Sequence, residues 1–277
     1  NPDDITDEYV AGLRLTSVNR ISLGIQSFDD RVLGFMNRRH TAAEAEVAVS
    51  RLRSAGYDNI SIDIIFGVAG FGDDHLLKSL QRAVALNVEH ISAYHLTVEE
   101  RTRLGIMTQR GEYRPVDEEQ SEREYLLVER VLAEAGYEHY EVSNYALEGC
   151  RAKHNSAYWA GVEYLGIGPG AHSFSGDDRT WCASTAKEYA EGDIRFEGER
   201  LSVIDHLNEY IMTSLRRVEG IDLAYIADHY GEAQRRRVER AARVWIDSGA
   251  LIICGDALAI PTSRFMLSDA IIETLFA

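Results

Sequence analysis

Polar side chains that could bind a ligand stand at or inside short apolar runs in the first half of the chain. Gln26 directly follows the run RISLGI, and Asp63 lies inside NISIDIIF, where a buried carboxylate is costly unless it is hydrogen-bonded or paired. Arg38 lies in a short polar link, and its guanidinium could bind a carboxylate through two hydrogen bonds or remain a surface charge. Because α/β enzymes hold their working groups at strand ends, Gln26, Arg38 and Asp63 are candidate ligand contacts, although Asp63 could also have a structural role.

Two histidines lie in a stretch, 149–178, that is rich in glycine and aromatic residues. His154 belongs to HNSAYW and His172 to GAHS. Either imidazole could bind a metal or heme iron, act as an acid or base, or hydrogen-bond within the fold, and the residues alone favour the structural role. The patterns HExxH, GxxxxGK[ST] and GxSxG are absent, and GIGPG lacks the GxGxxG spacing of a dinucleotide site.

Short β-rich runs alternate with helical patterns before residue 149. Strands are expected at 20–25, 59–66, 91–96 and 140–145, and helices at 41–55, 73–86 and 118–135. Thr41 and Glu44 have the spacing of a capping box, which predicts where the first of these helices begins. The alternation predicts a parallel α/β sheet with right-handed crossovers, either a barrel or an open doubly wound sheet.

The rest of the chain has a different pattern. The stretch 149–178 is expected to be a loop region that approaches a ligand closely. Helices are expected at 201–217, 222–230, 232–248 and 263–276, with a hairpin at 251–260. Three helices and a hairpin resemble a winged helix, here interpreted as a protein-contact or lid element. The expected domains are therefore 1–190 and 191–277.

Composition narrows the class of protein. The 277 residues have a mass of 31.1 kDa, are 45% hydrophobic and carry a formal charge of −16, which argues against general affinity for nucleic acid or an anionic membrane. Three cysteines without CxxC or CxxxCxxC spacing suggest reduced thiols in a cytoplasmic protein. The chain starts with Asn1 rather than Met, so it is expected to be cut from something longer.

Eight segments in order resemble one family, the radical S-adenosylmethionine (radical SAM) heme chaperones of the HemW-like branch, which are related to oxygen-independent coproporphyrinogen III oxidase. The segments are NPDDIT, NRISLGIQSF, NRRHTAAEAEVAV, NISIDIIFG, HISAYHLTVEE, GYEHYEVSNYA, KHNSAYW and EYLGIGPGAHSF. HNSAYW points to the chaperone branch rather than to the oxidase. The resemblance spans almost the whole chain.

The resemblance implies ligands for the candidate residues. Gln26, Arg38 and Asp63 match family positions that contact S-adenosylmethionine, and His154 is the candidate heme contact, with His172 and Trp159 as neighbours at best. The family also holds a [4Fe-4S] cluster through CxxxCxxC, a motif absent from these 277 residues. Two loops, GVAGFG and ERTR, depart from the family pattern.

The leading hypothesis is a fragment of a heme chaperone that delivers heme to membrane respiratory enzymes and binds no nucleic acid. Its fold would be an incomplete parallel α/β barrel of radical SAM type with a helical, winged-helix-like C-terminal domain. This fragment is expected to have no activity of its own. The alternatives are an oxygen-independent coproporphyrinogen III oxidase, which acts by oxidative decarboxylation in porphyrin biosynthesis, and a cluster-free binding protein.

Overall fold

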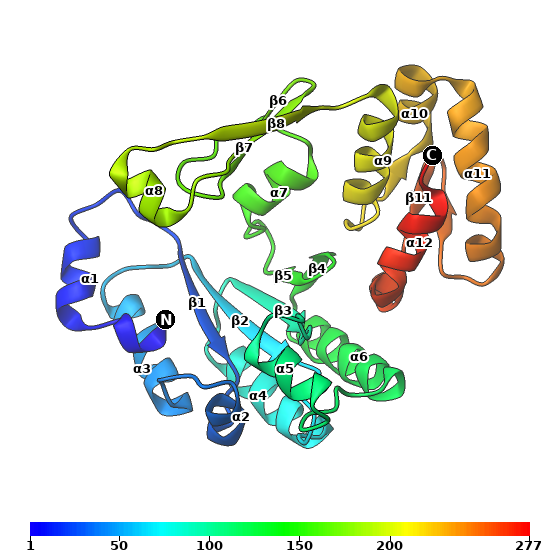
Figure 1. Ribbon diagram of the computed structural model, residues 1–277. Helices are drawn as coiled ribbons and strands as arrows, with labels where there is room; N and C mark the ends of the chain where they lie inside the picture. The colour runs from blue at the N-terminus through cyan, green and yellow to red at the C-terminus, as the bar shows by residue number, and fades with distance from the viewer. The chain divides into compact units, whose positions relative to one another are not determined.

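The computed structural model describes all 277 residues, which form two compact units, Asn1–Ala152 and Lys153–Ala277 (Figure 1). Each unit is described by itself. The division lies after Ala152, and the boundary expected at 190/191 stays a prediction about the domains of the family.

The first unit is built on a five-stranded sheet with helices packed against it. The strand order is β1 (Ile21–Gln26), β2 (Ile60–Phe66), β3 (His90–His95), β5 (Asn144–Ala146), β4 (Glu138–Glu141). The helices are α1 (Asp7–Leu13), α2 (Asp30–Phe35), α3 (Ala42–Ser54), α4 (Asp73–Ala85), α5 (Arg103–Gln109) and α6 (Glu118–Glu134). The expected strands and helices up to residue 135 are thus present, with α1, α2 and α5 in addition.

The two faces of the sheet differ in chemistry because strand side chains alternate. Ile60, Ile62 and Ile64 of β2 are fully buried on the face that helices α3, α4 and α6 cover (Figure 1). The intervening positions carry the polar residue Asp63 toward the other face. At the start of α3, Thr41 and Glu44 form the expected capping box.

The prediction of a fourth parallel strand at 140–145 was wrong. The chain reverses at Val142 and Ser143, so that the segment forms the antiparallel hairpin β4–β5. β5 then pairs antiparallel with β3, whereas β1, β2 and β3 are parallel. The result is a mixed sheet in which β1 and β4 are the edge strands, in place of an all-parallel barrel.

The second unit begins in the stretch expected to be a loop. It contains helix α7 (Lys153–Trp159) and the antiparallel strands β6 (His172–Ser175), β7 (Asp178–Cys182) and β8 (Phe196–Arg200). The loop expectation was therefore wrong for α7 and β6. Glu163 accepts a hydrogen bond from the backbone N–H of Gly176 at 2.7 Å, which secures the tight turn between β6 and β7. A short helix, α8 (Ala186–Glu191), separates β7 from β8.

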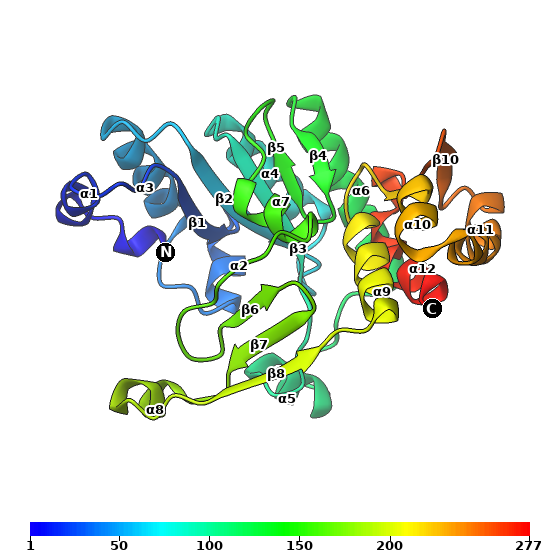
Figure 2. The same ribbon diagram turned by 90° about the horizontal axis from the view of Figure 1, so that it is seen from above.

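The expected C-terminal helices and hairpin are present (Figure 2), except that the helix expected at 263–276 is α-helical only from Ser268, because Thr262–Leu267 form a 3₁₀ helix. They are α9 (Val203–Ser214), α10 (Leu223–Tyr230), α11 (Glu232–Asp247), β10 (Ile252–Cys254), β11 (Ala257–Ala259) and α12 (Ser268–Leu275). The short strand β9 (Ile221–Asp222) pairs with β11. Fully buried Leu207, Ile211, Ile226 and Val238 form the core between the helices. None of the helices in either unit combines the length and the apolar composition needed to span a membrane.

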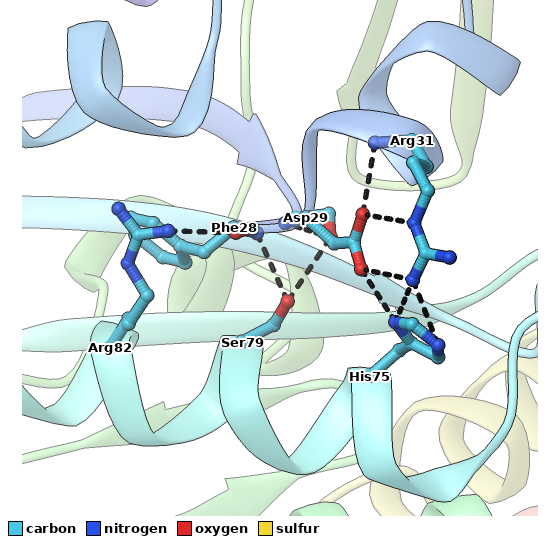
Figure 3. A network of polar contacts seen from close by, with 7 residues as sticks. Phe28, Asp29, Arg31, His75, Ser79 and Arg82 are labelled. Atoms are coloured by element: carbon cyan, nitrogen blue, oxygen red, sulfur yellow. Dashed lines mark hydrogen bonds and ion pairs between the residues drawn. The ribbon is translucent and has the colours of Figure 1, made fainter.

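A polar network joins the end of β1 to α4 (Figure 3). Asp29 caps α2 by accepting the N–H of Arg31 at 2.9 Å, and its carboxylate also contacts the Arg31 guanidinium and His75 of α4. Ser79 accepts the N–H of Phe28 at 3.0 Å, and Arg82 donates to the Phe28 carbonyl at 2.8 Å. These bonds fix the loop that follows β1.

Replacing Asp29 with alanine is expected to lower the free energy of unfolding by about 2 kcal/mol at pH 7, because a helix cap and two charged contacts are lost together. The hydrogen bond from Arg31 holds the pKa of Asp29 well below its usual range. The carboxylate therefore stabilises the fold above the ordinary pKa of an aspartate, and this stabilisation is lost as the pH falls toward the lowered pKa. Urea unfolding from pH 7 to pH 2 should show the difference between wild type and Asp29→Ala shrinking with acid. Exposed Asp74→Ala is the control, and a pH-independent difference would contradict the argument.

Candidate functional site

The polar face of the first unit's sheet gathers the ligand contacts expected from the sequence. β1 contributes Gln26, β2 contributes Asp63, and β3 contributes Ser92, which lies opposite Asp63 in the strand register. Arg38 reaches the same face from the loop after α2, since its guanidinium donates to the carbonyl of Gly24 at 2.7 Å. Three side chains predicted separately from sequence thus share one surface.

Gly24 makes room for two of these side chains. A Cβ atom at this position would lie 2.6 Å from Nε2 of Gln26 and 3.3 Å from Nη2 of Arg38. Gln26 itself has a positive φ of 72°, a conformation that favours glycine and is strained for a side chain. The register between β1 and β2 also shifts between Leu23 and Gln26. The backbone is therefore arranged so that an amide and a guanidinium lie together where β1 ends.

Asp63 is half-buried, and the pKa of its carboxyl group is raised. Burial raises its pKa, while its hydrogen bond with Ser92 and the charges of Arg20 and Arg38 oppose that rise. The two arginines place positive charge beside the carboxylate without neutralising it through a direct ion pair. Such a group can accept hydrogen bonds from hydroxyls or an amine of a ligand.

A buried relay of side chains continues the polar face. Ser61 contacts Nδ1 of His90 at 2.7 Å, and Nε2 of His90 contacts the Tyr140 hydroxyl at 2.9 Å. Burial lowers the pKa of His90 to about 4, so the ring is neutral at physiological pH. Burial likewise raises the pKa of Tyr140 to about 12. The relay therefore positions neutral hydrogen-bonding groups beside Asp63.

His90, Ser92 and Tyr94 also belong to this face and were not predicted from the sequence. The signal was available, because every second residue of HISAYH is polar and such residues point to one side of a strand. Burial raises the pKa of Tyr94, and the charges of Asp63 and Glu141 raise it further, which places Tyr94 in the field of Asp63.

His154 lies in the second unit, on α7, where it is exposed. Its ring meets the Tyr158 ring edge-on, with 4.8 Å between the centroids. The described residues contain no group of three or more His, Cys, Asp or Glu that could hold a metal ion. His172 stacks on Trp181 across the β6–β7 pair at 5.6 Å.

The side chains on the polar face and the cysteines differ in how well they suit the ligands that the sequence resemblance implies. Gln26, Arg38 and Asp63 supply an amide, a guanidinium and a carboxylate on one surface, a donor and acceptor set that suits an amino acid and ribose hydroxyls. The thiols do not fit an iron–sulfur cluster: Cys150 is partly buried, Cys182 is buried and Cys254 is exposed, and no site gathers three of them. These residues alone therefore do not form a site for such a cluster.

Comparisons with known proteins identify the family of the chain. Residues 1–83 match the sequence profile of the Radical SAM superfamily. The heme chaperone HemW of Mycobacterium tuberculosis (strain H37Rv) is 34% identical over 280 residues, a match that covers 99% of this chain and 70% of the relative. The heme chaperone HemW of Bacillus subtilis is 33% identical over 238 residues, which covers 84% of this chain and 63% of the relative.

A solved structure has the same fold. Coproporphyrinogen III oxidase (HemN) from Escherichia coli, described as a radical SAM enzyme, superimposes with a TM-score of 0.79 at 17% identity. The superposition covers 100% of this chain and 68% of that one. The matched profile and the similarity to the HemW chaperones define a protein of the radical SAM superfamily, and the shared fold is consistent with it. Within that superfamily, the chain belongs to the HemW heme chaperone family.

Proposed function

We propose that this chain is the S-adenosylmethionine-binding and heme-binding part of a cytoplasmic heme chaperone. The observation that carries the proposal is the 34% identity to the M. tuberculosis heme chaperone HemW over 99% of the chain. The relative's name gives heme as its ligand, and the exposed imidazole of His154 in HNSAYW is a suitable iron ligand. Heme would pass from this protein to heme-accepting enzymes at a membrane.

The polar face is proposed as the S-adenosylmethionine site. The Arg38 guanidinium suits the carboxylate of the methionyl part, while the Gln26 amide and the Asp63 carboxylate suit the amine and the ribose hydroxyls. A reduced [4Fe-4S] cluster, where one is bound, would supply the single electron that cleaves this ligand reductively. The cluster would require thiolates in a CxxxCxxC pattern, which these 277 residues do not supply.

Replacing His154 with alanine is expected to weaken heme binding at least tenfold, because the iron loses its imidazole ligand. Heme would be titrated into the wild type and the variant, with the Soret band as readout. His172→Ala is the matched control, since His172 is also exposed in the second unit. Equal affinity of His154→Ala and wild type would contradict the assignment of His154, and a wild type that does not bind heme would contradict the proposed function itself.

A second experiment separates chaperone from enzyme. The full-length protein, which would carry the cluster motif, would be reduced, reconstituted with its cluster and incubated with coproporphyrinogen III and S-adenosylmethionine under anaerobic conditions. The chaperone proposal expects heme binding without formation of protoporphyrinogen. Formation of protoporphyrinogen at a catalytic rate would show instead the oxidase activity named for the E. coli structure.

A further inference from the structure

The loop that follows β2, residues 67–72 with the sequence GVAGFG, is held from several sides of the first unit. It starts where β2 ends, on the strand that carries Asp63 of the polar face. It is also one of the two loops that depart from the family pattern. Neither the polar face nor the proposed function accounts for it, so its role has to follow from its own contacts.

A buried carboxylate on α6 fixes the start of this loop. Glu124 is 2% exposed, and it accepts the backbone N–H of Gly67 at 2.7 Å and the side-chain amide of Gln120 at 2.6 Å. The same Gln120 nitrogen donates to the backbone carbonyl of Phe71 at 3.2 Å. Because a buried carboxylate needs its hydrogen-bond partners, these contacts hold both ends of loop 67–72 against α6.

Phe71 connects the loop to the end of α2. Its ring meets the ring of Phe35, the last residue of α2, edge-on with 6.1 Å between the centroids. The ring of buried Tyr113 lies 5.6 Å from that of Phe35, and its hydroxyl accepts the N–H of Ala69 at 3.2 Å. Such aromatic pairs have a preferred geometry, so the three rings, here called the aromatic clamp, fix α2 and the loop relative to each other.

Little free space remains between α2 and loop 67–72. Val32 of α2 and Phe71 of the loop both line a cavity of about 20 Å³, which has room for a single water molecule. Closely packed groups transmit a displacement instead of absorbing it. A shift of Phe71 would therefore shift the end of α2.

The end of α2 in turn determines where Arg38 lies. The backbone N–H of Arg38 donates to the carbonyl of Leu33, in the last turn of α2, at 2.9 Å. The guanidinium donates to the carbonyl of Gly24 and to Oδ1 of Asn1, each at 2.7 Å. Both acceptors are neutral, so they leave the positive charge of Arg38 unpaired.

We propose that Phe71 is a positioning residue of the polar face: held by α6 and acting through Phe35 and α2, it places the Arg38 guanidinium where it binds the carboxylate of an amino-acid ligand. A guanidinium binds a carboxylate through two hydrogen bonds only when it is held within about 0.5 Å of the right position. This inference rests on the proposed function, since it deepens the assignment of Arg38 to the methionyl carboxylate. It makes the departing loop a determinant of specificity for that carboxylate.

Two ligands that differ only in the carboxylate isolate this effect, S-adenosylmethionine and decarboxylated S-adenosylmethionine. Isothermal titration of each into the 277-residue chain gives a ratio of affinities, which is expected to favour S-adenosylmethionine at least tenfold in the wild type. Phe71→Ala is expected to lower this ratio to about threefold or less, while affinity for the decarboxylated ligand stays within about twofold. Phe71→Tyr keeps the ring and should keep the wild-type ratio. Because these variants change no charge, general electrostatic attraction of the ligands is unaltered.

Tyr57→Leu is the matched control for lost aromatic packing. Tyr57 is a buried ring between α3 and β2 that takes part in none of these contacts, so its variant should keep the wild-type ratio. Phe35→Ala removes the partner ring, which is partly exposed, and tests the clamp with less loss of buried surface should Phe71→Ala fail to fold. Urea unfolding would verify that each variant folds.

Arg38→Gln shows whether Phe71 acts through Arg38. This variant should lower the ratio as Phe71→Ala does, and the double variant Arg38→Gln/Phe71→Ala should have the same ratio as Arg38→Gln, because an effect transmitted by Arg38 disappears with it.

The outcomes distinguish the inference from the proposed function. A wild type without preference for S-adenosylmethionine, or a wild-type ratio in Arg38→Gln, would overturn the proposed ligand site and the inference with it. A lowered ratio in Arg38→Gln beside a wild-type ratio in folded Phe71→Ala and Phe35→Ala would overturn the inference alone. A lowered ratio in Tyr57→Leu, or a further decrease in the double variant, would also overturn it, because the effect of Phe71 would then not pass through the clamp to Arg38.

Discussion

Asp63→Asn is expected to raise the free energy of unfolding by about 1 kcal/mol at pH 7, because the variant removes a charge that burial disfavours. The pKa of Asp63 is raised in the folded protein, so the folded state holds the proton more tightly than the unfolded state. Stability that this group contributes is therefore fully present below the ordinary pKa of an aspartate and is lost as the pH rises through the raised value. The gain from Asp63→Asn should accordingly disappear in acid.

The same substitution is expected to weaken binding of S-adenosylmethionine at least tenfold. A hydrogen bond to a charged acceptor contributes about 1.5–3 kcal/mol, and asparagine offers a neutral oxygen in its place. Isothermal titration of the ligand and urea unfolding between pH 3 and pH 8 would measure the two effects on one preparation. Asp58→Asn, at an exposed carboxylate before β2, is the control. A variant that is less stable at pH 7 and binds the ligand normally would assign Asp63 a structural role.

Gly220→Ala is expected to destabilise the second unit by about 3 kcal/mol or more. Gly220 has a φ of 70°, which costs an L-residue about 1–2 kcal/mol, and it precedes the short strand β9. A Cβ atom there would lie 2.3 Å from the carbonyl oxygen of Leu258 and 2.7 Å from Cα of Ala259. Both neighbours are backbone atoms of β11, so the methyl group can be accommodated only if the β9–β11 pair separates.

Gly249→Ala provides the comparison for this prediction. Gly249 has a similar φ of 74°, but no atom lies within 4 Å of its hypothetical Cβ. Its replacement by alanine should lower the free energy of unfolding only by the cost of the positive φ, about 1–2 kcal/mol. Urea unfolding of both variants would isolate the cost of the clash as the difference between them. Equal destabilisation by Gly220→Ala and Gly249→Ala would show that β11 shifts to accommodate the methyl group at no measurable cost.

The elements that could be predicted from sequence are those whose signals are local. The run NISIDIIF and the capping box of Thr41 and Glu44 each lie within one element, and both have the predicted form. The hairpin at Val142 and Ser143 was missed because no glycine or proline interrupts YEVSNY, and Ser143 alone is a weak turn signal, so the segment has the pattern of one strand. Its antiparallel placement beside β3 depends on contacts with His90, Ile91 and Ser92, which are distant in sequence.

For the same reason, only part of the candidate site could be predicted from the sequence. Gln26, Arg38 and Asp63 could be predicted because each is a polar residue within, or close to, a short apolar run or its connecting link. The partnership of His90 with Tyr140 joins side chains 50 positions apart, and no local pattern encodes it. The contacts that hold loop 67–72 likewise come from segments that lie far apart along the chain.

The mixed order of the sheet also has a consequence for how the protein reaches its native state. The β4–β5 hairpin joins neighbours in sequence and can close within microseconds, whereas each parallel pairing of β1, β2 and β3 requires a helical crossover to be completed first. The polar face takes its side chains from the three slow strands. Affinity for a ligand on that face is thus acquired late, and a partly folded chain that already contains the hairpin would display none of it.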